Sequence, residues 1–205
     1  PWNTTLGGIQ DSSLIEAVGY QIGTHARRMG VHLNFAPVVD INTNPENPII
    51  GNRSFGEDPH RVSRQATHLM RGMQRAGVLC TAKHFPGHGD TEVDSHKDLP
   101  VLNFDKERLD QIEIVPFKHL IDRGIGGVMV AHMEIPQLEP EKHLASTLSS
   151  NVINEILVNE LGFRGLVFTD ALNMDGVTKY YDQQEMGVKA LLAGNDVLLF
   201  PEDIN

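Results

Sequence analysis

Cysteine and positive charge are both scarce in this chain of 205 residues. The single cysteine, Cys80, excludes an internal disulfide, and its place in the apolar run 77–82 predicts a buried, unreactive thiol. Seventeen lysines and arginines stand against 27 acidic residues, and the formal net charge is −10. This balance argues against a nucleic-acid partner, because phosphate binding needs clustered cations. No run approaches the ~20 apolar residues that span a bilayer, so we expect no membrane segment.

Hydrophobic residues make up 40% of the chain, which is enough for one well-buried core. One domain is therefore the default expectation. The polar start, residues 1–5, carries neither a signal-peptide pattern nor an initiator methionine. A leader lost from a longer protein is left open by this start.

Helical and strand-like segments alternate along the sequence. Apolar residues at three- and four-residue steps predict a helix over 11–29, and a second is bounded by Asp58-Pro59 and Gly77. Further helices are expected from Asp105 to a break at Pro116, over 150–161, and up to Gly194. Apolar runs of strand length occupy 31–40, 78–82, 127–131, 166–169 and 197–200.

These runs lack polar alternation, which is typical of parallel strands buried on both faces. The fold class is therefore α/β. A doubly wound sheet and a (β/α) barrel share this rhythm, and five strands are too few to close an eight-stranded barrel. Both architectures gather functional residues at the carboxyl ends of their strands, so we expect the site among the residues that follow each strand.

Ionisable residues follow nearly every predicted strand: Asp40, the stretch 83–96, His132 with Glu134, Asp170, and Glu202 with Asp203. The stretch 83–96 is the richest, with three histidines, three acidic residues and a lysine. Gly87 and Gly89 give this loop backbone conformations that other residues avoid. We expect it to approach a ligand closely.

Within this loop, Asp94 and His96 form a candidate dyad, in which a carboxylate orients an imidazole for proton transfer near neutral pH. A polar surface loop explains the same triplet about equally well. Metal binding is a third interpretation, because the histidines and acids of the loop are all competent ligands. The spacing is not diagnostic, since His84 and His88 are separated by Pro86 and Gly87 and do not share a helical face.

Asp170 follows a buried apolar run, a position that suits a carboxylate at the mouth of a site or, alternatively, at the start of a helix. Arg53 lies in a long loop, where a salt bridge to Glu57 or Asp58 is the favoured interpretation and ligand binding the alternative. Met133 is expected in the core.

Three segments together resemble one known family. Residues 83–91, followed by Asp94-Ser95-His96, closely resemble the signature of family 3 glycoside hydrolases of the β-N-acetylglucosaminidase type. Residues 53–59 look like that family's sugar-binding arginine loop, and residues 168–172 look like its nucleophile segment. The resemblance covers essentially the whole chain.

The resemblance implies a retaining glycosidase on a (β/α) barrel of the TIM type. Asp170 would be the nucleophile, and His96 with Asp94 the acid/base pair. The family's sugar-binding residues would correspond to Arg53, Lys83 and His84. The implied substrate is a glycan or muropeptide with terminal N-acetylglucosamine, cleaved without metal or other cofactor, in a bacterial cytoplasm or cell envelope.

The family's barrel begins with strands that nothing here matches, so residues 1–205 are expected to be the C-terminal portion of one catalytic barrel domain. An incomplete barrel leaves open sheet edges. Three alternatives stay open: a metal-dependent hydrolase using the histidine loop, a catalytically silent carbohydrate-binding fragment, and a phosphorylase that transfers the sugar to phosphate.

Overall fold

The computed structural model describes residues 1–91 and 98–201. Its helices are α1 (Asn3–Gly7), α2 (Ser12–Arg28), η1 (Gly51–Arg53), α3 (Pro59–Arg75), α4 (Lys106–Gln111), α5 (Val115–Ile121), η2 (Ser146–Leu148), η3 (Asn151–Glu160), α6 (Asp175–Thr178) and α7 (Gln183–Ala193). Of these, η1 and η2 are 3₁₀-helices and η3 is a π-helix. The strands are β1 (Leu33–Asn34), β2 (Leu79–Phe85), β3 (Gly127–Val130), β4 (Leu166–Ala171) and β5 (Val197–Leu199).

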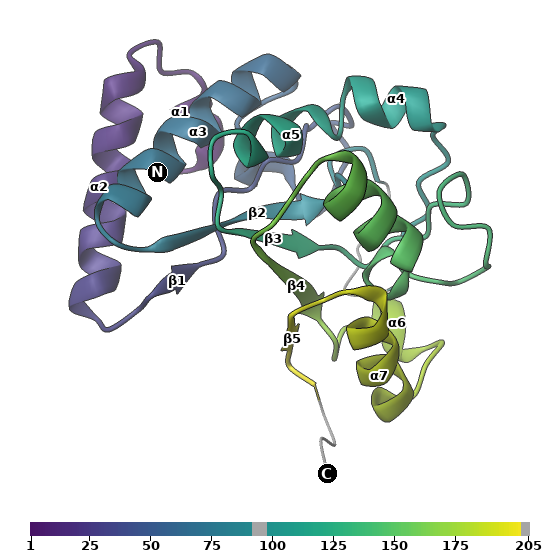
Figure 1. The fold of residues 1–205 in the computed structure, drawn as a ribbon. Coiled ribbons are helices and arrows are strands. Elements are labelled where there is room, and N and C mark those ends of the chain that lie inside the picture. The colour runs from purple at the N-terminus through teal and green to yellow at the C-terminus, as the bar shows by residue number, and fades with distance from the viewer. Residues whose placement is uncertain (92–97, 202–205) are drawn as a thin grey trace.

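The five strands form one parallel sheet in the order β1-β2-β3-β4-β5, so each strand pairs with its neighbours in the chain. A doubly wound sheet reverses its order at a switch point, whereas a barrel adds strands in one direction. The order therefore favours the barrel, and the prediction of an incomplete (β/α) barrel is confirmed. Figure 1 shows the strands fanning out below helices α3 and α5, with α2 at the left side of the molecule.

Local signals place most helix ends where the sequence predicts them. Asp11, Asp58 and Asp182 each cap a helix by accepting a hydrogen bond from a backbone N–H of the first turn. Gly194 ends α7 in the left-handed conformation. One prediction is wrong: Pro116 does not break a helix but lies in the first turn of α5, where a missing N–H costs nothing.

The first strand is shorter than predicted. Of the run 31–40 only Leu33 and Asn34 join the ladder, with Val38 forming a separate bridge to Lys83. The intervening Ala36–Pro37 peptide is cis, and Pro37 has no N–H to donate to a ladder. The interruption leaves Asp40 at the carboxyl end of the sheet.

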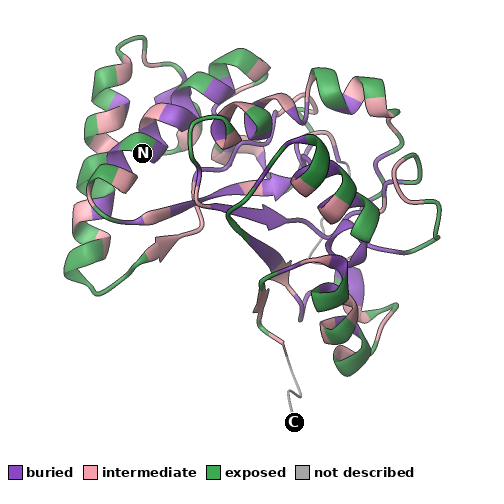
Figure 2. Cartoon of the chain, viewed as in Figure 1, coloured by how far each residue is buried: buried purple, intermediate pink, exposed green. Residues whose placement is uncertain are grey.

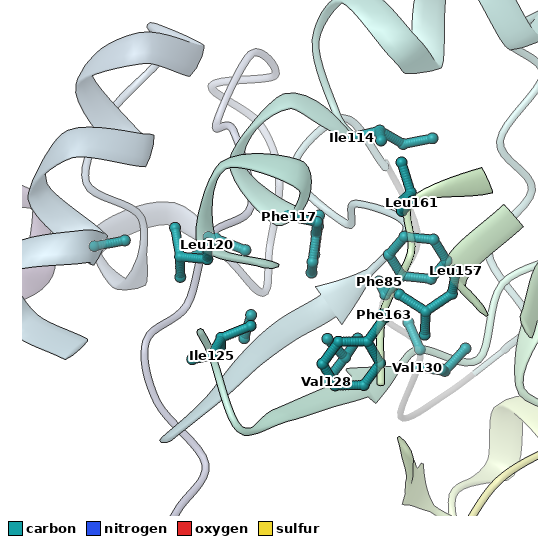
Figure 3. Packing of buried hydrophobic residues seen from close by; sticks show 14 of the residues in the cluster. Phe85, Ile114, Phe117, Leu120, Ile125, Val128, Val130, Leu157, Leu161 and Phe163 are labelled. Carbon is teal, nitrogen blue, oxygen red and sulfur yellow. The ribbon is translucent and has the colours of Figure 1, made fainter. Parts of the chain in front are cut away.

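The main core lies between the sheet and the helices that cover it. Figure 2 shows β2, β3 and β4 buried and the outward faces of the helices exposed. Cys80 is fully buried, as predicted, and burial raises the pKa of its thiol to about 12. Figure 3 shows side chains of β2, β3, α5 and the segment after η3 packed together. The rings of Phe85 and Phe117 pack edge to face, with 5.1 Å between their centroids.

Two glycines allow α2 and α3 to pack closely. A Cβ at Gly72 would lie 2.1 Å from the Glu16 carbonyl oxygen, and one at Gly19 would lie 2.3 Å from that of Leu69. Both contacts are with backbone atoms, which cannot move aside without separating the helices.

We expect Gly72→Ala to lower the free energy of unfolding by about 1–3 kcal/mol, because overpacking forces the two helices apart. Gly187→Ala is the control: it also lies within a helix, but its Cβ would meet nothing nearer than a Leu198 methyl at 3.8 Å. There alanine should stabilise by about 0.5–1 kcal/mol through helix propensity. Equal shifts in the two denaturant midpoints would contradict the packing argument.

Candidate functional site

The carboxyl ends of the strands open into a cavity of about 410 Å³. Its lining residues come from or follow all five strands and the loop after β1: Phe35, Ile49, Arg53, Lys83, His84, His88, Met129, Asp170, Ala171, Leu199 and Phe200. Four of the six residues proposed from sequence, Arg53, Lys83, His84 and Asp170, share this cavity. The other two, Asp94 and His96, lie outside the described residues.

Asp40 is the buried centre of the site's hydrogen bonding. Its carboxylate accepts the backbone N–H groups of His84, at 3.1 and 3.2 Å, and of His88, at 2.7 Å. It also lies 2.7 Å from the His84 Nδ1. Burial acts to raise the pKa of Asp40, but His84 and His88 outweigh it and hold that pKa below its ordinary value of 3.8. Asp40 is therefore an ionised anchor for both histidines.

The bond to Asp40 fixes the direction in which His84 points. Because His84 Nδ1 faces the carboxylate, its Nε2 is turned toward Arg53, whose Nη2 lies 3.3 Å away. A neutral imidazole with its proton on Nδ1 has an acceptor at Nε2, which suits the guanidinium. The Lys83–His84 peptide is cis. Neighbouring His84 and Lys83 both line the cavity.

Arg53 does not make the salt bridge that its sequence context favours. Its guanidinium contacts the Ile49 carbonyl at 3.4 Å and His84, while Asp58 caps α3 instead. The backbone of Arg53 is held separately, since its carbonyl accepts a 2.7 Å hydrogen bond from the Asn3 side chain. The predicted salt bridge to Glu57 or Asp58 is thus wrong, and Arg53 lines the cavity, while its binding of a ligand stays a prediction.

Asp170 stands in the fourth strand near its carboxyl end, with its side chain in the cavity and one oxygen 2.9 Å from the Ala171 N–H. Burial acts to raise the pKa of Asp170, but His84, His132, the Ala171 N–H and Lys83 together lower it below its ordinary value. The carboxylate is therefore ionised at neutral pH. It does not cap a helix, because α6 begins only at Asp175.

Lys83 lies close enough to Asp170 for each charge to shift the pKa of the other. Burial and the nearby Arg53 lower the pKa of Lys83, while Asp170 and Asp40 act in the opposite direction. Arg53 and Lys83 therefore place positive charge beside Asp170 in one partly desolvated cavity. Such a set can hold sugar hydroxyls and carboxylates with charge-assisted hydrogen bonds.

His132 and Met133 are buried and are not among the residues that line the cavity. Met133 is fully buried, which confirms its predicted place in the core. His132 is also fully buried, with Nδ1 2.8 Å from the Thr147 hydroxyl and Nε2 3.0 Å from the Ala171 carbonyl. It supports the end of β4, one residue from Asp170.

Arg108 binds Asp90, in the loop that follows β2. Its Nη1 donates to both oxygens of Glu113 at 2.6 Å, and its Nη2 donates to Asp90 at 3.2 Å. Glu113 is buried, and a Cβ at Gly87 would lie 2.6 Å from its Cβ. Burial raises the pKa of Glu113 against the opposing influence of Arg108. Gly87 lies against Glu113, in the segment between α4 and α5, and Asp90 is held by Arg108.

We expect Arg108→Met to lower the free energy of unfolding by about 3 kcal/mol at pH 7, because it leaves a buried carboxylate unpaired. The folded pKa of Glu113 is already raised above 4.5, so its ionisation costs stability as pH rises through that folded value. The penalty should therefore shrink toward pH 4. Adding Glu113→Gln should recover much of the loss, and a penalty that grows on acidification would contradict this origin.

Within the part of the chain that the structure describes, no three histidine, cysteine, aspartate or glutamate side chains are grouped as metal ligands. Asp94 and His96, which the metal interpretation includes, are outside that part. In the same described part, no helix has both the length and the apolar character needed to cross a membrane.

Sequence reasoning did not assign a site role to Asp40 or Arg108, and it offered His88 only as a possible metal ligand. Asp40 carried a signal, since it ends a predicted strand as Asp170 does. His88 is almost fully buried, and its Nδ1 lies 2.7 Å from the Thr91 hydroxyl. Nothing local marks Arg108, whose partners lie 5 and 18 positions away.

The whole chain, residues 1–205, matches the glycosyl hydrolase family 3 N-terminal domain. It is 36% identical over 205 residues to β-hexosaminidase A of Pseudoalteromonas piscicida, covering 95% of this chain and 34% of that protein. It superposes on a family 3 β-N-acetylglucosaminidase from Paenibacillus sp. str. FPU-7 with a TM-score of 0.94 and 48% identity, covering 97% of this chain and 38% of that one.

A second solved structure, of the β-glucoside phosphorylase BglX bound to 2FGlc, has a TM-score of 0.94 at 31% identity. That match covers 98% of this chain and 37% of the phosphorylase chain. The chain thus spans between 34% and 38% of the length of these three proteins.

Proposed function

The chain belongs to glycosyl hydrolase family 3, and from this premise we propose that it carries most of the catalytic site of a retaining β-N-acetylglucosaminidase. The observation that carries the proposal is the convergence of Asp170, Arg53, Lys83 and His84 on one cavity at the carboxyl ends of the strands. We place residues 1–205 in the C-terminal portion of a single barrel domain. Among the described residues β1 and β5 are the edge strands, and a closed barrel would pair each of them with a further strand.

Asp170 is the nucleophile in this proposal. An ionised Asp170 carboxylate attacks the anomeric carbon, a glycosyl–oxygen bond to Asp170 forms, and the bond to the leaving group breaks. Water then attacks the same carbon from the opposite face, which releases Asp170 and retains the anomeric configuration. The lowered pKa of Asp170 supports this role because a nucleophilic carboxylate must be ionised at the working pH.

His96 and Asp94 supply the proton transfers. The His96 imidazolium gives a proton to the departing oxygen in the first step, and the neutral imidazole removes one from water in the second. Asp94 orients the imidazole. A histidine places no second anion beside Asp170, which differs from the paired carboxylates usual among glycosidases.

Arg53, Lys83 and His84 hold the sugar. Sugar hydroxyls donate to and accept from neighbouring groups, and the cavity offers cationic donors on Arg53 and Lys83 together with the Nε2 of His84. The substrate proposed is a glycan ending in β-linked N-acetylglucosamine, such as a muropeptide released in peptidoglycan turnover. The part of the substrate that the cavity would bind is an uncharged terminal sugar.

The first test is hydrolysis of 4-nitrophenyl β-N-acetylglucosaminide by the full-length enzyme, with and without EDTA. Hydrolysis that EDTA leaves unchanged supports the glycosidase, whereas loss that Zn²⁺ or Mn²⁺ restores would transfer the proposal to a metal-dependent hydrolase. Sugar binding without turnover would identify a silent carbohydrate-binding protein.

A second test addresses the acid. His96→Ala should lose at least about tenfold more activity on a disaccharide, whose leaving group is a sugar hydroxyl, than on the 4-nitrophenyl substrate. Only the sugar alkoxide needs a proton in order to leave. Asp94→Asn should show the same pattern more weakly. Equal losses on the two substrates would remove His96 from the acid role.

Phosphate is the alternative acceptor. The cationic Arg53 and Lys83 in the cavity, and the similarity to a β-glucoside phosphorylase, favour this second candidate. Reaction with added phosphate would then yield N-acetylglucosamine 1-phosphate, in which the acceptor oxygen comes from phosphate in place of water. Product analysis by ³¹P NMR distinguishes the two, since a hydrolase releases only the free sugar.

A further inference from the structure

A second polar cavity, of about 380 Å³, lies between α3 and α5. It is lined by His60, Ser63, Arg64, Thr67, His68 and Arg71 of α3, with His119 of α5 and Arg123 just after it. No residue is shared with the cavity that contains Asp170. The α3 residues recur at three- and four-residue steps, so they form one face of the helix.

Positive charge is concentrated in this cavity although the chain carries a net charge of −10. Three arginines and three histidines line it, and none of its described lining residues is acidic. The guanidinium groups of Arg64 and Arg71 make no ion pair or hydrogen bond with another described side chain. Arg123 uses one nitrogen on the His119 carbonyl at 3.0 Å, which leaves further donors on the same guanidinium.

Acidic side chains of neighbouring elements have ion pairs of their own. Glu16 of α2 lies 3.1 Å from Arg75 and 3.6 Å from His68 Nδ1. An adjacent cavity shares His60, His119 and Arg123, but its acids pair with lysines: Asp110 and Glu160 with Lys106, and Asp122 with Lys118. The positive charge of Arg64 and Arg71 is therefore not neutralised within the described structure.

The electrostatics of His119 agree with this picture. Burial and the neighbouring Arg123 lower the pKa of His119, with smaller contributions in the same direction from His60 and Arg71 and an opposing one from Asp122. The Ser63 and Thr67 hydroxyls donate to backbone carbonyls of their own helix. The guanidinium groups of the three arginines are thus the cationic donors that line the cavity.

We propose that this α3–α5 cavity is a binding site for a small phosphate-bearing anion, separate from the catalytic cavity. Planar guanidinium forks match phosphate oxygens with paired hydrogen bonds, and two such forks on one face of α3, Arg64 and Arg71, about two turns apart, suit a ligand carrying at least two negative charges. The volume would hold on the order of a dozen waters at roughly 30 Å³ each, which exceeds one orthophosphate. Pyrophosphate or a phosphorylated sugar fills it better.

The test is isothermal titration of the full-length protein at 0.15 M NaCl with orthophosphate, pyrophosphate, glucose 6-phosphate and citrate. We expect pyrophosphate to bind with Kd below about 1 mM, and more tightly than orthophosphate. Glucose 6-phosphate binding as tightly as pyrophosphate would identify a sugar phosphate as the ligand source. Citrate binding as tightly as either would overturn the preference for phosphate.

The variants locate the site. Arg64→Gln combined with Arg71→Gln should raise the Kd for pyrophosphate at least tenfold, while Arg61→Gln, an exposed arginine of the same helix outside the lining, should leave it unchanged. All of these side chains are exposed, so thermal unfolding should shift little. Unchanged affinity in the double variant, or affinity lost instead on Arg53→Gln, would overturn the proposal and place any binding elsewhere.

Discussion

Replacing Asp170 with asparagine is expected to lower kcat for N-acetylglucosaminide hydrolysis by on the order of 10⁴-fold, about 5–6 kcal/mol of transition-state stabilisation. The amide keeps the size of the side chain but has no charge to attack the anomeric carbon. KM should change little, because Arg53, Lys83 and His84 remain in place to hold the sugar. Steady-state kinetics on the full-length enzyme measure both constants.

The matched control for this variant is Asp175→Asn, a nearby exposed acid at the start of α6. This variant removes only a negative charge that is favourable at the start of a helix, which is worth about 0.3–1 kcal/mol of stability. Its kcat should stay within about twofold of the wild-type value. The pH profile gives a second check: because the pKa of Asp170 is lowered, the acid limb due to this group should lie below its ordinary value of 3.8. An Asp170→Asn variant as active as the control would exclude Asp170 as nucleophile.

Replacing Asp40 with asparagine should produce the largest loss of stability, about 3–5 kcal/mol in the free energy of unfolding. One carboxylate oxygen becomes an NH₂ group that faces an N–H donor of His84 or His88, and the buried donor is left unsatisfied. The freed His84 ring would also lose its orientation toward the sugar, which should lower kcat/KM by roughly 10²-fold. Chemical denaturation and kinetics measure the two effects.

The pH dependence of this difference follows from the direction of the Asp40 pKa shift. Because its folded pKa lies below 3.8, the stability that it contributes is present above pH 4 and is lost as pH falls through the folded value. Asp110→Asn is the control, an exposed acid whose pairing with Lys106 should be worth less than about 1 kcal/mol. Equal losses for the two variants would contradict the anchoring role of Asp40.

The fold was largely predictable because each local signal agrees with the global arrangement. Continuous apolar runs predicted four of the five strands closely, apolar periodicity predicted α2, and the Asp58 cap predicted the start of α3. The barrel itself was not predictable from periodicity, since it depends on which strands pair. The short β1 was missed because Pro37, which has no N–H to donate to a ladder, lies within the predicted run 31–40. The helix start at Pro116 was missed because proline breaks a helix interior but is tolerated in the first turn.

The residues of the candidate site were predictable from sequence motifs, but the contacts that hold them in place were not. The family motif singled out Arg53, Lys83, His84 and Asp170, which the structure brings to one cavity. The supporting contacts join residues far apart in the chain: Asp40 reaches His84 across 44 positions, and Arg53 reaches it across 31. No local pattern encodes such pairs, and so the salt bridge favoured for Arg53 was wrong.

The central claim, a covalent sugar on Asp170, is tested most directly by trapping that intermediate. A 5-fluoro-N-acetylglucosaminyl fluoride slows both steps by destabilising the oxocarbenium-like transition state, while its fluoride leaving group keeps the first step faster than the second. Intact and peptide mass spectrometry of the full-length enzyme should then show one added sugar, on the peptide that contains Asp170, and none in Asp170→Asn. A sugar on any other residue, or rapid turnover to the inverted anomer with no adduct, would contradict the account.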